Sequence, residues 1–150
     1  MKDLSTKKSI PRLKSIWKDK STFELRELVA DYVKAHLKGV RVMNRHLKIP
    51  ITITVTGGRK TARGGAMYHK KAEIIRALPQ IIEIAKYNNF GQRKDTDSAV
   101  VIGYLNFKSK CYIDGGLEDI RLSIQFQKGG KYYYNIETNK KGSTPKESRR

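Results

Sequence analysis

A basic, glycine-rich segment between residues 57 and 71 has the residue types best suited to chemistry on a phosphodiester. It contains no acidic residue, and its glycines would let the backbone approach a ligand closely. Exposed amides near a helix start also favour an anion. Its polar members are Arg59, Lys60, Thr61, Arg63, Tyr68, His69, Lys70 and Lys71. The alternative interpretation is a solvated basic loop with no catalytic duty.

His69 is the acid–base candidate among the three histidines. An imidazole can take up a proton near neutral pH in one step and return it in another. A histidine near a helix start is by itself more often a plain surface residue, so it is the surrounding cations that favour a catalytic role. His36 is predicted to be a packed or capping residue, and His46 to lie in a basic loop over residues 41–48.

Tyrosines in the last third of the chain form a second candidate group: Tyr104, Tyr112, Tyr132, Tyr133 and Tyr134. In a strand, the outer two of three consecutive residues share one face. Rings beside Arg121 and Lys131 would offer a stacking and cation–π surface for unpaired bases. Tyrosines are also ordinary strand formers, which is the interpretation we favour for most of them. Tyr134 or Tyr104 is the one expected to face a cleft.

Carboxylates are sparse and are not arranged as facing pairs. Those of the last third lie in or beside predicted turns: Asp95, Asp97, Asp114, Glu118 and Asp119. A two-metal nuclease needs clustered carboxylates, and the single Cys111 excludes a thiolate zinc site. We therefore expect no metal and no cofactor. Cleavage without a metal would restrict the substrate to RNA, whose 2′-hydroxyl can attack the phosphate itself.

The charge of the chain indicates a polyanionic partner. Lysine and arginine number 32 against 14 acidic residues, a formal net charge of +18. Such a surface attracts nucleic acid, an anionic membrane or an acidic protein at long range. No run approaches the roughly 18 apolar residues of a membrane span, and the polar N-terminal residues do not resemble a signal peptide. We expect RNA as the partner, no membrane contact and a cytoplasmic location.

The length of 150 residues predicts one domain. Residues 1–20 are expected to form a basic arm or a short helix, residues 21–138 a single α+β domain, and residues 139–150 a disordered basic tail. Ser21 to Glu24 has the spacing of a capping box, which predicts a helix that Gly39 would end.

Alternating and helical patterns predict the elements in between. Residues 49–56 alternate as a strand does, and residues 57–65 are predicted to be a loop. Residues 74–85 show a helical apolar face that Pro79 interrupts, so we expect a kink or two short helices. Residues 88–91 are expected to close this helical stretch.

The last third predicts an antiparallel meander. Strands are expected over residues 100–107, 111–114, 117–127 and 131–138, with turns at 108–110, 115–116 and 128–130. The fold class is therefore α+β, with N-terminal helices packed on a mainly antiparallel sheet of four to five strands.

These features together resemble the barnase, EndoU, colicin and RelE-like (BECR) nuclease superfamily, in the phage and mobile-element forms attached to large polyvalent proteins. The resemblance covers residues 41–138, and the order of elements with the basic histidine segment carries it. The matching stretches are the strand 51–55, residues 58–61, His69 leading into residues 77–82, residues 112–115 and residues 130–134.

The resemblance implies a BECR-like fold and a metal-independent endoribonuclease that leaves 2′,3′-cyclic phosphate ends. Such enzymes are often toxins or delivered effectors that an acidic immunity protein or antitoxin neutralises. Carried over by position, Lys60 and His69 would be catalytic, with Arg59 or Arg63 holding phosphate. A meander tyrosine such as Tyr134, or Ser123, would complete the site. The remaining substrate-binding candidates are Thr61, Lys70, Lys71, Tyr104 and Arg121. The glutamate that acts as base in some members has no counterpart here.

Other functions fit the same residues. A non-catalytic nucleic-acid-binding module of a phage or mobile element needs only the charge and the tyrosines. An inert ribosome-associated protein with a basic arm and tail is a third interpretation. Binding to a membrane surface is the least favoured, because the basic stretches lack a strong apolar face apart from residues 10–17.

Overall fold

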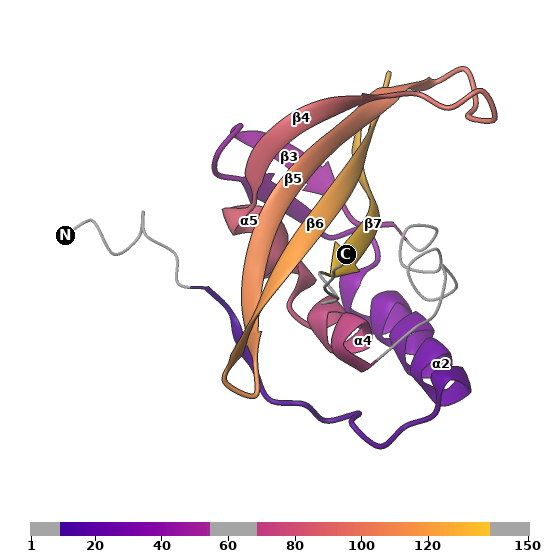
Figure 1. Cartoon of the computed structure of the whole chain (residues 1–150). Coiled ribbons are helices and arrows are strands. Elements are labelled where there is room, and N and C mark those ends of the chain that lie inside the picture. Colours follow the sequence, from indigo (N-terminus) through magenta and orange to yellow (C-terminus); the bar gives the residue numbers. More distant parts are fainter. Residues whose placement is uncertain (1–9, 55–68, 139–150) are drawn as a thin grey trace, which may run out of the picture.

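The computed structural model describes residues 10–54 and 69–138 (Figure 1). The predicted loop at 57–65 and the predicted tail lie outside these residues. The elements are, in chain order, β1 (Arg12–Leu13), α2 (Thr22–Tyr32), the π-helical turn η1 (Val33–Leu37), β2 (Arg41–Asn44), β3 (Ile49–Thr52), α4 (His69–Ile75), α5 (Leu78–Ile84), β4 (Lys86–Gln92), β5 (Val101–Ile113), β6 (Gly116–Gln127) and β7 (Gly130–Thr138).

The strands form one mixed sheet, and the fold class is α+β as expected. The sheet contains seven described strands in the order β1-β5-β6-β7-β3-β2, with β4 also paired to β5. Strands β4 to β7 pair antiparallel, whereas β1 pairs with β5 and β3 with β7 in parallel. The predicted sheet of four to five mainly antiparallel strands is thus too small. Strands that pair in parallel are far apart in sequence and are not joined by a hairpin turn, so no turn motif predicts their pairing.

The sheet curls around the helices that follow β3. Figure 1 shows α4 and α5 on one side of the strands, and α5 contacts both β2 and β5. Helix α4 contacts β5 and β7, and α2 packs against α4. The core lies between these layers and is built from fully buried aliphatic and aromatic side chains, among them Ile74, Leu78, Ile82, Phe107, Leu122 and Ile124.

Local sequence signals explain the helix boundaries. The Ser21 hydroxyl accepts a hydrogen bond from the Glu24 amide at 3.1 Å, and the Glu24 carboxylate accepts one from the Ser21 amide at 2.9 Å. This confirms the capping box. Gly39 has a φ of +78°, the left-handed conformation that ends many helices, which confirms the predicted stop. Pro79 lies in the first turn of α5, so the two short helices are also confirmed.

Three predictions in the sheet are wrong. The predicted turn at residues 108–110 lies inside β5, which is continuous for 13 residues. Serine is common in turns, but the Ser109 hydroxyl donates to the Ile81 carbonyl oxygen at 2.9 Å in the core. Residues 88–91 belong to β4, a strand whose polar residues are mostly exposed. Residues 41–44, predicted to be loop, form β2.

A buried amide fixes the end of α5. Asn44, on β2, is fully buried, and its Nδ2 donates to the carbonyl oxygens of Ile82 at 2.8 Å and Ala85 at 2.9 Å. Its Oδ1 accepts from the Leu47 amide at 2.9 Å. Carbonyls at a helix C-terminus have no partner within the helix, so β2 supplies one from across the core.

A buried carboxylate fixes the N-terminal arm, which has no helix over residues 10–20. Glu73 is fully buried in α4, and its Oε2 accepts from the amides of Ile16 at 3.0 Å and Trp17 at 2.8 Å. Its Oε1 pairs with Arg76 at 2.6 Å. The Trp17 side chain packs into the core, so this one carboxylate joins the arm, α4 and the core.

Substituting Glu73→Ala should therefore lower the free energy of unfolding by about 3 kcal/mol, because two amides and a guanidinium are left without their acceptor. Urea denaturation monitored by Trp17 fluorescence would measure the change. The matched control is Glu27→Ala, an exposed position on α2, with an expected change below about 0.5 kcal/mol. Equal destabilisation in the two variants would contradict the assigned role.

Candidate nucleic-acid interface

One face of the sheet has no described helix on it, and strand alternation decides which side chains lie there. Side chains directly opposite each other on neighbouring strands share a face. Phe107, Leu122 and Ile136 face the helices, so the residues adjacent to them in β5 and β6 point the other way. We call the exposed or half-buried polar side chains at these positions the open face: Lys86, Asn89, Asn106, Lys108, Arg121 and Ser123.

Three cations form a row across the open face. Lys86 lies opposite Lys108, and Lys108 lies opposite Arg121, on β4, β5 and β6. All three are exposed. An acid enters the row only on β7, where Glu137 lies opposite Arg121. Like charges placed directly opposite each other weaken a sheet, so this row has a cost in stability that an anionic ligand would offset.

A second row beside the cations is uncharged and hydrogen-bonded. Asn106 Nδ2 donates to Asn89 Oδ1 at 3.0 Å, and Ser123 Oγ donates to Asn106 Oδ1 at 3.2 Å. These bonds hold the amides in fixed orientations. Both rows run perpendicular to the strands, so together they give the open face a band of positive charge next to a band of hydrogen-bonding groups.

Tyr104 lies on this side of the sheet but is only 6% exposed. Its hydroxyl donates to Asp97 Oδ2 at 2.7 Å, and the Lys94 ammonium lies 5.2 Å from the centre of its ring. The amide of Lys94 and the hydroxyl of Tyr104 both donate to Asp97, which lowers the pKa of that carboxyl. The β4–β5 connection therefore covers the ring, and Tyr104 supports this hairpin rather than lying open for a base.

His69 is at the start of α4, near the β5–β6 turn. The pKa of Asp114 in that turn is lowered, first by the hydrogen bond from the Ser15 amide at 2.9 Å and to a smaller extent by the charges of Lys18 and His69. His69 thus has a carboxylate in its surroundings. Its neighbour Lys70 pairs with Glu118 at 2.9 Å. Lys71 is only 6% exposed and lies in the buried layer.

The predicted site residues therefore fall into separate places. Arg121 and Ser123 lie together on the open face. His69 and Lys70 lie in the helix layer on the other side of the sheet. The remaining predicted site residues, namely Arg59, Lys60, Thr61, Arg63 and the side chain of Tyr134, fall outside the part that the structure describes.

Sequence reasoning did not select Lys86 and Lys108 for the open face. The pattern predicts Lys108 in a turn and Lys86 at the end of a helix. Lys86 and Lys108 each stand next to an apolar residue of the core side, Tyr87 and Phe107. This pattern places the two lysines on the opposite face, but only if both segments are already known to be strands.

Comparison with known proteins places the chain in a family. The family model described as large polyvalent protein-associated domain 3 matches residues 20–134. No curated protein and no solved structure matches the chain. No described helix has the length and apolar character needed to cross a membrane. Among residues 10–54 and 69–138, no three histidine, cysteine, aspartate or glutamate residues are grouped so that they could hold a metal ion.

The lowered pKa of Asp114 predicts a pH-dependent contribution to stability. A carboxyl whose pKa is depressed in the folded state stabilises the fold above its ordinary value of 3.8, and this effect disappears as the pH falls through the lowered value. Asp114→Asn should therefore lower the melting temperature at pH 7 but not below the lowered pKa. Asparagine tolerates the positive φ of 49° at this position.

Thermal melts of the native protein and the variant across this pH range would check the expectation. The exposed Asp31→Asn on α2 is the control, and its melting temperature should follow the native protein at each pH. A difference at Asp114 that stays constant from neutral to acid pH would contradict it.

Proposed function

We propose that the chain, which belongs to the large polyvalent protein-associated domain 3 family, binds RNA across the open face of its sheet. This membership agrees with the expected likeness to domains attached to large polyvalent proteins. That the chain also belongs to the BECR nuclease superfamily is part of the proposal.

The row of Lys86, Lys108 and Arg121 is the observation that carries the binding proposal. Directly opposed positions on neighbouring strands have Cβ atoms about 5 Å apart, so three cations in such a row form a compact positive strip. Phosphates follow one another along a nucleic-acid strand at comparable intervals, about 3.4 Å along the axis of a duplex and farther apart in an extended strand. The net charge of +18 adds long-range attraction to this local match.

The neighbouring amide row favours RNA over a membrane surface. Amide and hydroxyl groups offer donors and acceptors to base edges and to the 2′-hydroxyl, whereas a lipid surface favours apolar side chains. The polar groups of Asn106 and Ser123 lie beside Lys108 and Arg121, two positions along the same strands. A strand of RNA could therefore contact phosphate-binding and hydrogen-bonding groups at once.

Removing two charges from the row tests this proposal. Lys108→Ala/Arg121→Ala should weaken binding of a single-stranded RNA and lower the slope of log affinity against log salt by about two, because each removed cation neutralises one phosphate. Fluorescence anisotropy with a labelled oligonucleotide would measure both quantities. The matched control is Lys34→Ala/Lys38→Ala, which removes the same charge from exposed positions in and next to η1. An equal decrease of affinity in both double variants would overturn the assignment to the open face.

A second candidate function is RNA cleavage without a metal, favoured by the position of His69 near Asp114. In this scheme His69 takes the proton of a 2′-hydroxyl, and the 2′-oxygen forms a bond to phosphorus. The bond from phosphorus to the 5′-oxygen breaks, and that oxygen leaves as a hydroxyl after it takes a proton from solvent water, while the proton on His69 returns to solvent. Lys60 and one of Arg59 and Arg63 would stabilise the charge on the pentacoordinate phosphate. An acidic protein that covers these cations would inhibit the reaction, as expected of a toxin or effector.

Incubation with total RNA and a labelled tRNA in EDTA would test cleavage. The expected result is fragments with 2′,3′-cyclic phosphate ends, which a Lys60→Ala/His69→Ala variant no longer produces although it keeps most of its RNA affinity. Intact RNA with both proteins, together with salt-dependent binding, would exclude the enzyme and leave the binding module.

A further inference from the structure

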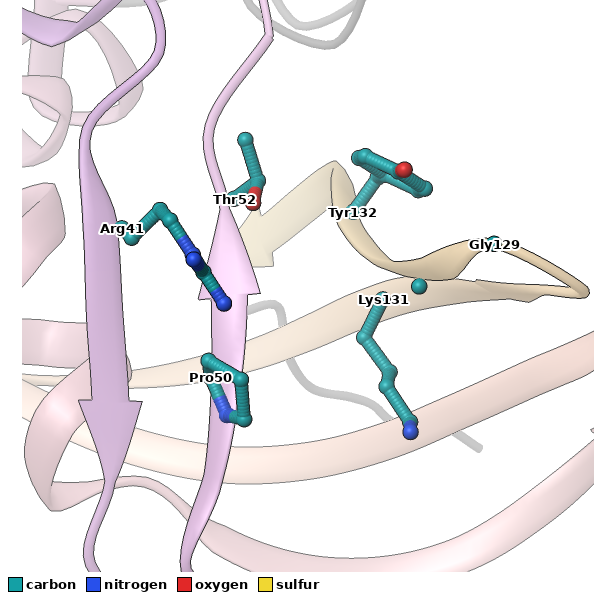
Figure 2. Close-up of a pocket in the computed structure, with 7 residues that line it drawn as sticks. Arg41, Pro50, Thr52, Gly129, Lys131 and Tyr132 are labelled. Atoms are coloured by element: carbon teal, nitrogen blue, oxygen red, sulfur yellow. The ribbon is translucent and has the colours of Figure 1, made fainter.

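An open pocket of ≈ 480 Å³ lies where β3 meets the start of β7 (Figure 2). Arg41, Pro50 and Thr52 line it from β2 and β3, and Gly130, Lys131 and Tyr132 line it from β7. Pockets that bind small ligands usually have volumes of roughly 300 to 1,000 Å³. This one has the size for a single nucleotide.

The pocket belongs to the same side of the sheet as the open face. Strand register places Arg41 opposite Thr52, Thr52 opposite Tyr132, and Tyr132 opposite Gln125. Ile51 and Ile53 are buried in the core, so Thr52 between them points away from the helices, as Gln125 does between Ile124 and Phe126. The pocket is therefore an extension of the open face onto β3 and β2.

Two cations from different strands border the pocket, and none of its lining residues is acidic. Arg41 is exposed and has no carboxylate partner among the residues described. The Lys131 ammonium lies 4.8 Å from the centre of the Phe126 ring, a cation–π contact on the side of the strand opposite to Tyr132. Figure 2 shows the Arg41 side chain extending beside Pro50 and the Lys131 side chain pointing away from Tyr132. On the side of Tyr132, the Arg41 guanidinium is therefore the cation suited to a phosphate group.

The other lining residues are suited to a flat, apolar group. Tyr132 presents an aromatic ring, and Pro50 adds an apolar surface without an amide donor. A Cβ atom at Gly130 would lie 3.2 Å from the Tyr132 hydroxyl oxygen and 3.4 Å from the adjacent ring carbon. The glycine turn therefore makes the room in which this ring lies, and a larger residue there would displace it.

We infer that this pocket holds one nucleoside monophosphate unit, with its phosphate at Arg41 and its base against Tyr132. The unit could be a free nucleotide or one residue of a bound RNA strand, and the shared chemistry is a phosphate joined to a planar base. The second source rests on the proposed function, because the pocket continues the face assigned to RNA.

Titration of the protein with adenosine 5′-monophosphate, adenosine and inorganic phosphate would test this inference, with NMR shifts or calorimetry as the readout. The nucleotide should bind at least about tenfold more tightly than either of its parts. Arg41→Ala and Tyr132→Leu should each weaken its binding by about tenfold, because the first removes a phosphate ligand and the second a stacking surface. The control Lys34→Ala removes an exposed charge from η1, which does not line the pocket, and should leave the affinity unchanged.

The same variants with an RNA oligonucleotide identify the source of the unit. If Arg41→Ala also lowers the affinity for RNA, the pocket holds one residue of the bound RNA. If the affinity for RNA is unchanged, the pocket holds a free nucleotide. No nucleotide binding at millimolar concentration, or equal binding by the nucleotide and adenosine, would overturn the inference. Because the open-face variant Lys108→Ala/Arg121→Ala leaves the pocket residues intact, failure of RNA binding and failure of the pocket would be seen separately.

Discussion

The buried carboxylate of Glu73 is the constraint on which much of the fold depends. An ionised carboxylate inside a protein is costly unless its oxygens are fully hydrogen-bonded, and here the partners come from one distant segment and from the next turn of the chain. The amides of Ile16 and Trp17 reach it from the N-terminal arm, and Arg76 reaches it from its own helix region. The Arg76 guanidinium also donates to the Lys14 carbonyl oxygen at 2.6 Å. These bonds attach the arm to α4 a few residues after β1, which pairs with β5.

The parts of the fold that could be predicted are those with local causes. The capping box at Ser21, the stop at Gly39 and the break at Pro79 act through neighbouring residues, so a short window of sequence is enough to locate them. The strands that sequence reasoning missed have their causes far away. Strand β4 is polar because most of it is exposed. Strand β2 has only four residues, of which Val42 and Asn44 face inward. No window of sequence records that α5 lies against both β2 and β5.

The candidate site was predictable only in its chemistry. Composition indicates the sign of the partner's charge, but it cannot say which of many cations share a surface. Strand register does this for Lys108 and Arg121, whose separation along the chain hides that they are opposite neighbours. In the same way, the ring of Tyr104 is suited to stacking on a base, but Asp97 and Lys94 of the β4–β5 connection cover it. The path of this connection cannot be predicted from the spacing of apolar residues. Arg41 was not predicted because residues 41–48 were expected to be a basic loop, whereas Arg41 is the first residue of β2.

The parallel contact between Thr52 and Tyr132 has a consequence for synthesis on the ribosome. It is the only residue pair in register between β3 and β7 among the described residues, and its two members are made at widely separated times. Translation adds about 5–20 residues each second, so β7 is synthesised several seconds after β2 and β3. During that interval a nascent chain already carries Arg41 but has no Tyr132 opposite it. The pocket between them is thus a property of the finished chain, and a chain still being translated, close to ribosomal RNA, does not yet present it.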